Sequence, residues 1–330
     1  MRNGVIAASL WALLAGSAAP AAPAGDVLPE PAAVAPDVWL IPGSFRPRRQ
    51  PDGNTVMVQT GKRDWLVMDT GRHAWQRDAI LKFVRERNGR IVAIVNSHWH
   101  LDHVSGNPAL KVAFPGAVVY ASSAIDGALT GFLATSAAGA REMLASGKLP
   151  DETAEDVPND LETTRNGAAL RPDSPVTASR TLKLGARSLR LELAPDAATA
   201  GDVWLWDAKS ATVVAGDLVT LPAPFLDTAC PEGWRRALSR VSAMPFQRVI
   251  PGHGPVMDRA AFETWRAAYG GFIDCAKSAR PAAECAAAWA EGASSFLATA
   301  RSRAQAHDMA GYYVDLLRKH GTKSPDCRSA

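Results

Sequence analysis

The chain has 330 residues, and its 36 lysines and arginines nearly balance 33 aspartates and glutamates, giving a formal net charge of +3. This length can bury one large core, so an α/β fold of this size needs no second domain. The charge pattern contains no basic stripe of the kind that binds nucleic acid, and we expect no nucleic-acid partner.

The first residues are typical of a secretory signal peptide. A positively charged start at residues 1–3 precedes an apolar segment at 5–14, which is too short for a stable membrane span. Small residues at 22–24 then precede Gly25. We predict a signal peptide at residues 1–24 and a periplasmic or secreted mature protein without a membrane span. An uncleaved anchor is the alternative, and the brief, alanine-rich apolar stretch argues against it.

Strands and helices alternate along the rest of the chain, which predicts an α/β fold. The first helix is expected at residues 75–87, because Ile80, Leu81 and Val84 recur at helical spacing. We expect strands at residues 38–41, 55–59, 65–68, 91–95 and 117–120, a helix at 124–146, a hairpin at 182–193 that turns at Gly185, and helices at 260–276, 282–290 and 295–317.

Two features are expected to carry no chemistry of their own. The acidic, proline-rich residues 150–174 predict either a surface loop or lid that overhangs a site, or a disordered connection. The isolated histidines His73, His307 and His320 are expected to be ordinary surface or loop residues.

The densest group of chemistry-bearing side chains follows the apolar run at residues 91–95. Residues 97–103, Ser-His-Trp-His-Leu-Asp-His, place three imidazoles and a carboxylate at the end of a predicted buried strand. Neutral imidazoles and ionised carboxylates are ligands that zinc accepts, and His98 and His100 can grip one ion from an extended backbone. Asp102 and His103 can then reach a second ion. A histidine-rich polar loop without metal is the alternative interpretation.

Two later strand ends each carry one candidate ligand. His253 lies in a Pro-Gly-His-Gly turn, where flanking glycines let the backbone turn sharply, although such a histidine can also be structural. Asp217 follows the apolar run at residues 211–215 and could bridge two metals. A turn-capping aspartate is the equally good alternative for Asp217.

Together these residues resemble the metallo-β-lactamase superfamily. The His-Trp-His-Leu-Asp-His run matches the HxHxDH motif of that family, and residues 66–71 match its early strand and turn. The resemblance implies an αββα four-layer sandwich, with a metallo-β-lactamase-like domain at residues 25–257 and a helical extension at 258–330 packed on it. The secreted location, the Pro-Gly-His-Gly turn and the cysteine-bearing tail are similar to the quinoprotein relay system zinc metallohydrolases.

The resemblance also implies roles for single residues. Asp69 matches a carboxylate that orients the ligands without touching metal. The zinc ligands that the resemblance implies are His98 and His100 for a first ion, Asp102, His103 and His253 for a second, and Asp217 between them.

One position departs from the family pattern. Ala198 stands where the third histidine of the first zinc site is expected. That site is short of a ligand, so its affinity should fall below that of a complete site. Asp196 is a possible substitute ligand, although an aspartate beside proline is more often a turn former. We expect one well-occupied zinc and leave the second open.

The resemblance implies a zinc-dependent hydrolase for a small-molecule substrate. A metal-bound hydroxide would attack the carbonyl of an ester, lactone, amide or thioester, and Asp102 would orient the water and deliver a proton to the leaving group. β-Lactamase activity is less favoured, because Asp217 stands where many such enzymes carry cysteine. The alternative is a non-catalytic periplasmic binding or accessory protein whose metal site has degenerated at Ala198. The oligomeric state stays open.

The cysteines form an even set, which favours disulfides in a secreted protein over thiolate ligands. Of the three possible pairings we favour Cys275 with Cys285, because residues 277–281 predict a tight connection between two helices. Cys230 with Cys327 would then fasten the tail to the body.

Overall fold

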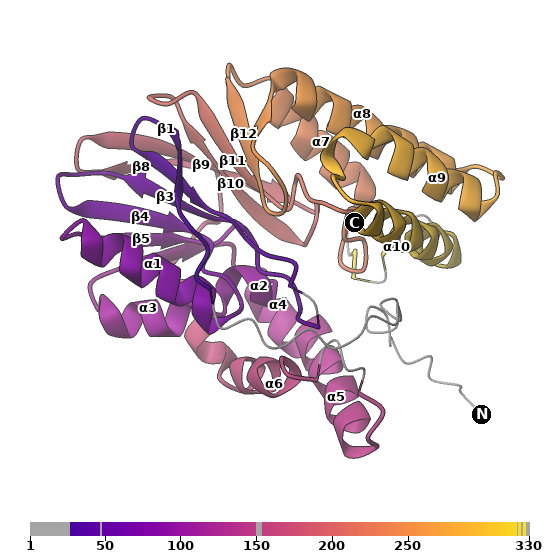
Figure 1. Ribbon diagram of the computed structural model, residues 1–330, viewed down its shortest axis with the longest axis horizontal. Helices are drawn as coiled ribbons and strands as arrows, with labels where there is room; N and C mark the ends of the chain where they lie inside the picture. Colours follow the sequence, from indigo (N-terminus) through magenta and orange to yellow (C-terminus); the bar gives the residue numbers. More distant parts are fainter. Residues whose placement is uncertain (1–26, 47, 150–153, 322, 325, 328–330) are drawn as a thin grey trace.

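The computed structural model describes residues 27–46, 48–149, 154–321, 323–324 and 326–327. Its strands form two sheets that pack face to face, and helices cover the outer faces (Figure 1). The expected αββα sandwich is therefore confirmed. The predicted signal peptide, residues 1–24, lies outside the described residues.

The first sheet contains seven strands with mixed pairing. β4 and β5 run parallel with Met68 opposite Val95, so that their carboxyl ends meet at one edge. β5 is an almost continuous apolar run, as expected of a strand that is covered on both faces. The strands in spatial order are β1 (Ala32–Ala35), β2 (Val38–Ile41), β3 (Thr55–Gln59), β4 (Asp64–Met68), β5 (Arg90–Val95), β6 (Val118–Ala121) and β7 (Ser174–Pro175).

The second sheet contains six strands. β11 and β12 run parallel with Gly216 opposite Pro251. In this sheet too, the carboxyl ends of two neighbouring strands therefore lie at one edge. The predicted hairpin is present as β8 and β9, and Gly185 in its turn has a φ of 54°. The spatial order is β13 (Met257–Asp258), β12 (Arg248–Pro251), β11 (Thr212–Gly216), β10 (Gly201–Asp207), β9 (Arg187–Pro195) and β8 (Arg180–Leu184).

Apolar side chains fill the layers between these elements. Leu66 and Val95 from the first sheet pack with Leu205 and Ile250 from the second. Outside the first sheet lie α1 and α3, and outside the second lie α7 to α10 (Figure 1). The helices are α1 (Ala74–Glu86), α2 (Leu101–Val104), α3 (Asn107–Ala113), α4 (Ile125–Thr130), α5 (Phe132–Ala145), α6 (Val157–Arg165), α7 (Pro231–Ser242), α8 (Arg259–Lys277), α9 (Ala282–Gly292) and α10 (Ala300–Lys319), with single 3₁₀ turns at Gly167–Leu170 and Ser294–Phe296.

The structure contains elements that were not expected, among them β1, β10, α3 and α7, and it changes three of the expected segments. The helix expected at residues 124–146 is broken at Gly131 into α4 and α5. The segment 150–174, expected as a loop, contains α6, because Val157 and Leu161 lie one helical turn apart and pack against α5. The last helix begins at Ala300 instead of 295, because Thr299 caps it.

Two disulfides join the carboxy-terminal elements. Cys275 at the end of α8 is bonded to Cys285 in α9, and Cys230 before α7 is bonded to Cys327 in the tail. These are the two pairs that the sequence argument favoured.

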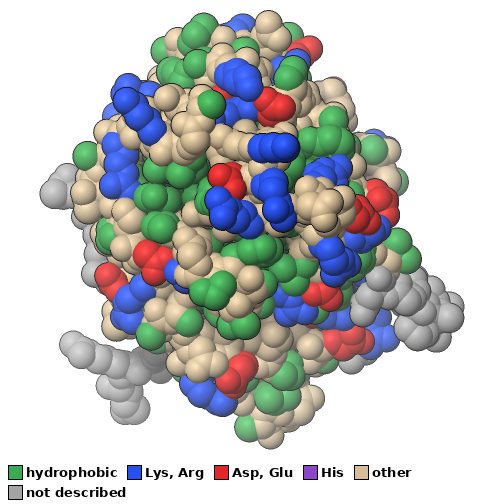
Figure 2. Space-filling model, turned by 90° about the vertical axis from the view of Figure 1, so that its left-hand side faces the viewer, with side chains coloured by type: hydrophobic (Ala, Val, Ile, Leu, Met, Phe, Trp, Pro, Cys, Tyr) green, Lys and Arg blue, Asp and Glu red, His purple; other side chains and the backbone are tan. Residues whose placement is uncertain are grey.

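The described surface carries mixed charges. On the face in Figure 2, lysine and arginine side chains are interspersed with acidic and apolar ones. Within the described part of the chain, no helix combines the length and the hydropathy that crossing a bilayer requires.

Candidate metal centre

The carboxyl ends of three strands, β5, β11 and β12, converge at one edge of the sandwich. β5 leads into the histidine motif, β11 ends before Asp217, and β12 ends two residues before His253. The Gly252 amide donates to the Gly216 carbonyl at 2.8 Å, and this bond joins the last two segments. Five of the six predicted ligands form two groups at this edge: His98, Asp102, His103, Asp217 and His253.

The two groups share one imidazole. The ligand atoms of His98, His103 and Asp217 lie within 4.8 Å of one another, as do those of Asp102, His103 and His253. His103 Nε2 is 3.4 Å from Asp217 Oδ1 and 3.5 Å from Asp102 Oδ2. His98 Nε2 is 3.8 Å from Asp217 Oδ2, and His253 Nε2 is 2.9 Å from Asp102 Oδ2.

Four side-chain atoms of these five residues are buried without a hydrogen-bond partner. They are His98 Nε2, His103 Nε2, Asp217 Oδ1 and His253 Nδ1. A buried polar atom without a partner costs free energy, and native structures seldom contain several that face one another. Imidazole nitrogens and carboxylate oxygens are zinc ligands, so the residues present fit a zinc ion.

Neighbouring side chains determine which nitrogen of each histidine faces the cluster. His103 Nδ1 donates to Asp69 Oδ2 at 2.8 Å, and this leaves its Nε2 for the cluster. Ser97 Oγ donates to the same oxygen at 2.7 Å, so it accepts from His98 Nδ1, which is 2.9 Å away. Asp69 thus holds His103 directly and His98 through Ser97, as carboxylates around metal sites do.

His100 is arranged differently and belongs to neither group among the described residues. The Thr228 hydroxyl donates to the Ala198 carbonyl at 2.9 Å, and it can accept from His100 Nε2 at 3.2 Å. Nδ1 of His100 is then the nitrogen left with a free lone pair. Ala198 is buried at the position without the expected histidine. Asp196, the possible substitute, occupies the β9–β10 turn at a φ of 51° and joins neither group.

Close backbone approach constrains two glycines at the cluster. A Cβ on Gly252 would lie 1.9 Å from Asp217 Oδ1, and a Cβ on Gly53 would lie 2.5 Å from His103 Cε1. Any larger residue at these positions would displace a candidate ligand.

Burial and charge shift the pKa values of the cluster in opposite directions. Burial, reinforced by the charges of His103 and His100, lowers the pKa of His98 well below its usual value, and burial lowers that of His100 to about 3. Burial opposes the charge of Asp102, but the charges of His103 and His253 outweigh it and hold the pKa of Asp102 well below its usual range. Burial opposes the charges of His103 and His253, but the carboxylates of Asp102 and Asp217 outweigh it and raise the pKa of both histidines. A bound metal would therefore have to displace a proton from each of these two rings.

Aromatic rings line the approach to His100 and His253. Trp99 and Phe225 lie 4.6 and 4.9 Å from the His100 ring, measured between ring centroids. Phe45 lies 5.5 Å from the His253 ring and is half exposed. Trp99 itself is buried and packs beneath the motif.

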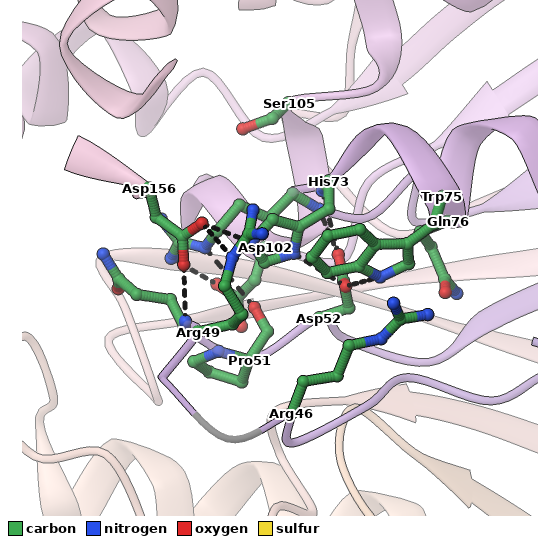
Figure 3. A network of polar contacts seen from close by, with 12 residues as sticks. Arg46, Arg49, Pro51, Asp52, His73, Trp75, Gln76, Asp102, Ser105 and Asp156 are labelled. Atoms are coloured by element: carbon green, nitrogen blue, oxygen red, sulfur yellow. Dashed lines mark hydrogen bonds and ion pairs between the residues drawn. The ribbon is translucent and has the colours of Figure 1, made fainter. Parts of the chain in front are cut away.

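His73 lies in the bend before α1, as the loop interpretation expects, but it is not a surface residue. His73 is buried before α1, with Nδ1 2.8 Å from Asp52 Oδ2 and Nε2 3.1 Å from Asp156 Oδ1 (Figure 3). Its ring stacks on Trp75 at 3.9 Å. These contacts join segments more than 80 residues apart in the chain, which local spacing does not reveal.

Sequence reasoning also missed Arg72 and Thr228. Arg72 Nη2 lies 3.7 Å from Asp102 Oδ1, and Thr228 contacts His100. The position of Arg72 directly after the Asp-Thr-Gly turn was the one available signal for it. Thr228 has no comparable signal, because it lies 128 residues from His100.

Comparisons with known proteins identify the family of this chain and several relatives. A family model described as "Metallo-beta-lactamase superfamily" matches residues 48–253. An atrochrysone carboxyl ACP thioesterase of Aspergillus chevalieri is 42% identical over 64 residues, 19% of this chain and 20% of that protein. A hydroxyacylglutathione hydrolase of Acaryochloris marina is 44% identical over 52 residues, 16% of this chain and 20% of that protein. The match thus spans a fifth of each relative.

A solved structure extends the comparison to the whole fold. The crystal structure of the DIM-1 metallo-beta-lactamase superposes with a TM-score of 0.51 at 17% identity, covering 73% of this chain and 96% of that one. At this identity the likeness shows a shared fold.

Proposed function

Because the chain belongs to the metallo-beta-lactamase superfamily, we propose that it is a zinc-dependent hydrolase of a small molecule with a reactive carbonyl. The observation that carries this proposal is the buried cluster in which His98 Nε2, His103 Nε2 and Asp217 Oδ1 face one another without hydrogen-bond partners. A scaffold without metal has no physical reason to bury these atoms together.

The chain offers ligands for one complete site and part of another. His103 Nε2 has one lone pair and would serve one ion, either with His98 and Asp217 or with Asp102 and His253. The two remaining residues would form part of a second position. When bound, zinc would supply a Lewis acid for the carbonyl oxygen and a water of lowered pKa. We propose one well-occupied zinc, with Nδ1 of His100 as a further ligand atom near a site that Ala198 leaves incomplete.

The protein's own side chains would perform the remaining steps. Asp102 Oδ2 faces the cluster, where it can orient the attacking water and pass a proton to the leaving group. Phe225 and Phe45 would contact the apolar part of the substrate and exclude water from the carbonyl.

Thioesters are the first substrate class to test among esters, lactones, amides and thioesters. One relative is named as a carboxyl ACP thioesterase and another as a hydroxyacylglutathione hydrolase. Both names describe hydrolysis of a bond to an acyl group. The aromatic rings beside His100 and His253 would suit an apolar acyl chain.

The second candidate is a non-catalytic binding or accessory protein with a degenerate metal site. The observation in its favour is that Ala198 replaces a histidine and that His100, bonded to Thr228, joins neither ligand group among the described residues.

We further propose that the protein acts in the periplasm or outside the cell after loss of residues 1–24. Two disulfides, Cys230–Cys327 and Cys275–Cys285, support an oxidising compartment. Residues 25–257 would form the catalytic domain. Residues 258–330 would be a helical extension, and the described helices α8 to α10 of that range share a core with the second sheet.

The test measures zinc and activity on the same preparations. The chain is produced in an oxidising compartment, its zinc content is measured per chain, and thioester, lactone, ester and β-lactam substrates are assayed. Wild type is compared with Asp102→Ala and Ala198→His. We expect bound zinc in wild type, and hydrolysis that Asp102→Ala reduces by at least 100-fold, about 2.7 kcal/mol of barrier.

A wild-type protein that binds zinc but hydrolyses nothing, and gains activity with Ala198→His, would favour the accessory protein. A wild-type protein that binds no zinc would contradict the proposed function.

A further inference from the structure

We propose that Arg72 is a positioning residue that directs one oxygen of Asp102 toward the metal centre, and that Asp160 of α6 holds Arg72 in place. This inference rests on the proposed function, because it concerns how a candidate zinc ligand is oriented. The segments of Pro51, Arg72, Asp102 and Asp160 meet around the guanidinium of Arg72.

Arg72 is fixed at its backbone and is buried. It follows Gly71, whose φ of 73° turns the chain after β4, and its amide donates to Asp52 Oδ1 at 2.7 Å. Only 9% of the Arg72 side chain is exposed. A buried guanidinium is costly unless each of its arms has an acceptor.

Each arm of this guanidinium points to a different segment. Nε donates to the Pro51 carbonyl at 3.3 Å, and Nη1 donates to Asp160 Oδ2 at 2.6 Å. Nη2 lies 3.7 Å from Asp102 Oδ1, an ion pair too long for a hydrogen bond. The guanidinium is planar and rigid, so the first two bonds determine where the third arm lies.

The two oxygens of Asp102 are thereby given different neighbours. Oδ1 faces Arg72, whereas Oδ2 lies 2.9 Å from His253 Nε2 and 3.5 Å from His103 Nε2. A carboxylate free to rotate could present either oxygen, or both, to a cation. The positive charge beside Oδ1 makes Oδ2 the metal-facing oxygen, as contacts outside the ligand shell commonly do.

Asp160 prevents the same arginine from competing for Asp102. Its short bond to Nη1 draws the guanidinium toward α6, and Gln50 Nε2 donates to the same oxygen at 3.0 Å. Without the charge of Asp160, Arg72 would pair more closely with Asp102 and would oppose the cation there. The helix in the segment expected as a loop therefore takes part in forming the metal centre.

The test compares variants at both ends of this contact in the full chain. Arg72→Met removes the charge, Arg72→Lys keeps it without the rigid fork, and Asp160→Asn weakens the anchor. Arg187→Met is the control, because the Arg187 side chain is even less exposed than that of Arg72 and pairs with Asp207, which is no candidate ligand. Zinc affinity is measured by competition with a chromophoric chelator, and the coordination of cobalt(II) by its visible spectrum.

We expect Arg72→Met to weaken zinc binding by about 10- to 100-fold and to change the cobalt spectrum. Arg72→Lys should restore part of the affinity, and Asp160→Asn should weaken binding less than Arg72→Met does. Arg187→Met should lower stability toward urea but leave the affinity and the spectrum unchanged.

A folded Arg72→Met protein with wild-type affinity and spectrum would overturn the inference and leave the proposed function intact. Equal losses in Arg72→Met and Arg187→Met would also overturn it, because general destabilisation would then explain both. A wild-type protein that binds neither zinc nor cobalt would overturn the proposed function and this inference together.

Discussion

His98 and His103 each use one ring nitrogen to contact a neighbour and keep the other for the centre. Asp69 accepts from His103 directly and reaches His98 through Ser97. The same carboxylate also accepts from the Ser97 amide at 2.7 Å. A single buried aspartate at the end of β4 therefore orients two candidate ligands on the neighbouring strand end.

The first prediction concerns the backbone beneath Asp217. Gly252→Ala should abolish zinc binding and activity, because the new methyl group would lie 1.9 Å from Asp217 Oδ1 and would force the carboxylate out of the cluster. Zinc content per chain and hydrolysis rate provide the measurement. Gly116→Ala is the control, since nothing lies within 4 Å of its added Cβ. Full zinc content in Gly252→Ala would contradict the placement of Asp217.

At the scale of elements, α6 is fastened to the body of the protein by polar contacts. Asp156, just before this helix, accepts from Arg49 Nε at 2.7 Å and from the Gln50 amide at 2.6 Å, and it lies against His73 (Figure 3). Few apolar side chains support the helix, so its docking should depend on these charges more than that of α8 or α10 does.

The second prediction is a pH dependence that originates at His73. Burial works against its charge, but the carboxylates of Asp156 and Asp52 outweigh that cost and raise the pKa of His73 above 6.5. A group whose pKa is higher in the folded than in the unfolded protein contributes its full stabilisation at pH values below the unfolded pKa. This contribution is lost as the pH rises through the folded pKa. The stability lost in His73→Gln, measured by urea unfolding, should therefore be largest near pH 6 and should shrink toward pH 9.

The comparison needs a control for the loss of a histidine as such. His307 lies on α10 with 45% of its side chain exposed, and its Nδ1 is 3.3 Å from Oδ1 of the neighbouring Asp308. His307→Gln is the control. This substitution should change stability little at any of these pH values. A loss in His73→Gln that stays constant with pH would contradict the assignment.

At the scale of the whole molecule, a disulfide joins the carboxy-terminal tail to the segment of Thr228, the residue that contacts His100. Cys327 is bonded to Cys230, whose amide donates to the Ala197 carbonyl at 2.8 Å. Thr228, which contacts His100, lies two residues before Cys230. The disulfide thus fastens the segment that contains Thr228 and contacts Ala197 and Ala198, whereas the Cys275–Cys285 bridge joins α8 to α9.

The third prediction compares the two bridges. The Cys230–Cys327 bond spans 97 residues and the Cys275–Cys285 bond spans 10. In the chain-entropy model, replacing both cysteines of a pair by serine should cost about 4.7 kcal/mol for the long loop and about 2.7 kcal/mol for the short one. Urea unfolding under oxidising conditions measures both. Loss of the long bridge alone should also raise KM, and an equal rise for both pairs would contradict the link between the tail and the centre.

Much of the fold and several candidate ligands could be predicted from local sequence pattern. Apolar runs predicted the central strands, and the motif at residues 97–103 was recognisable because four of its groups lie within six residues of one another. Asp217 and His253 were found because each follows a buried strand directly. The helix α6 was missed because only Val157 and Leu161 mark its buried face within an acidic segment.

What only the tertiary structure decided are the contacts between distant segments. In the tertiary structure His103 belongs to both ligand groups of the described residues, whereas His100 contacts Thr228 and belongs to neither. The tertiary structure also buries His73, and it links Arg72 to Asp160, 88 residues away. Periodicity reports which face of an element is buried, because that depends on neighbours a few residues apart. It does not report which side chains of other elements meet that face, because that depends on how the two sheets and their helices pack.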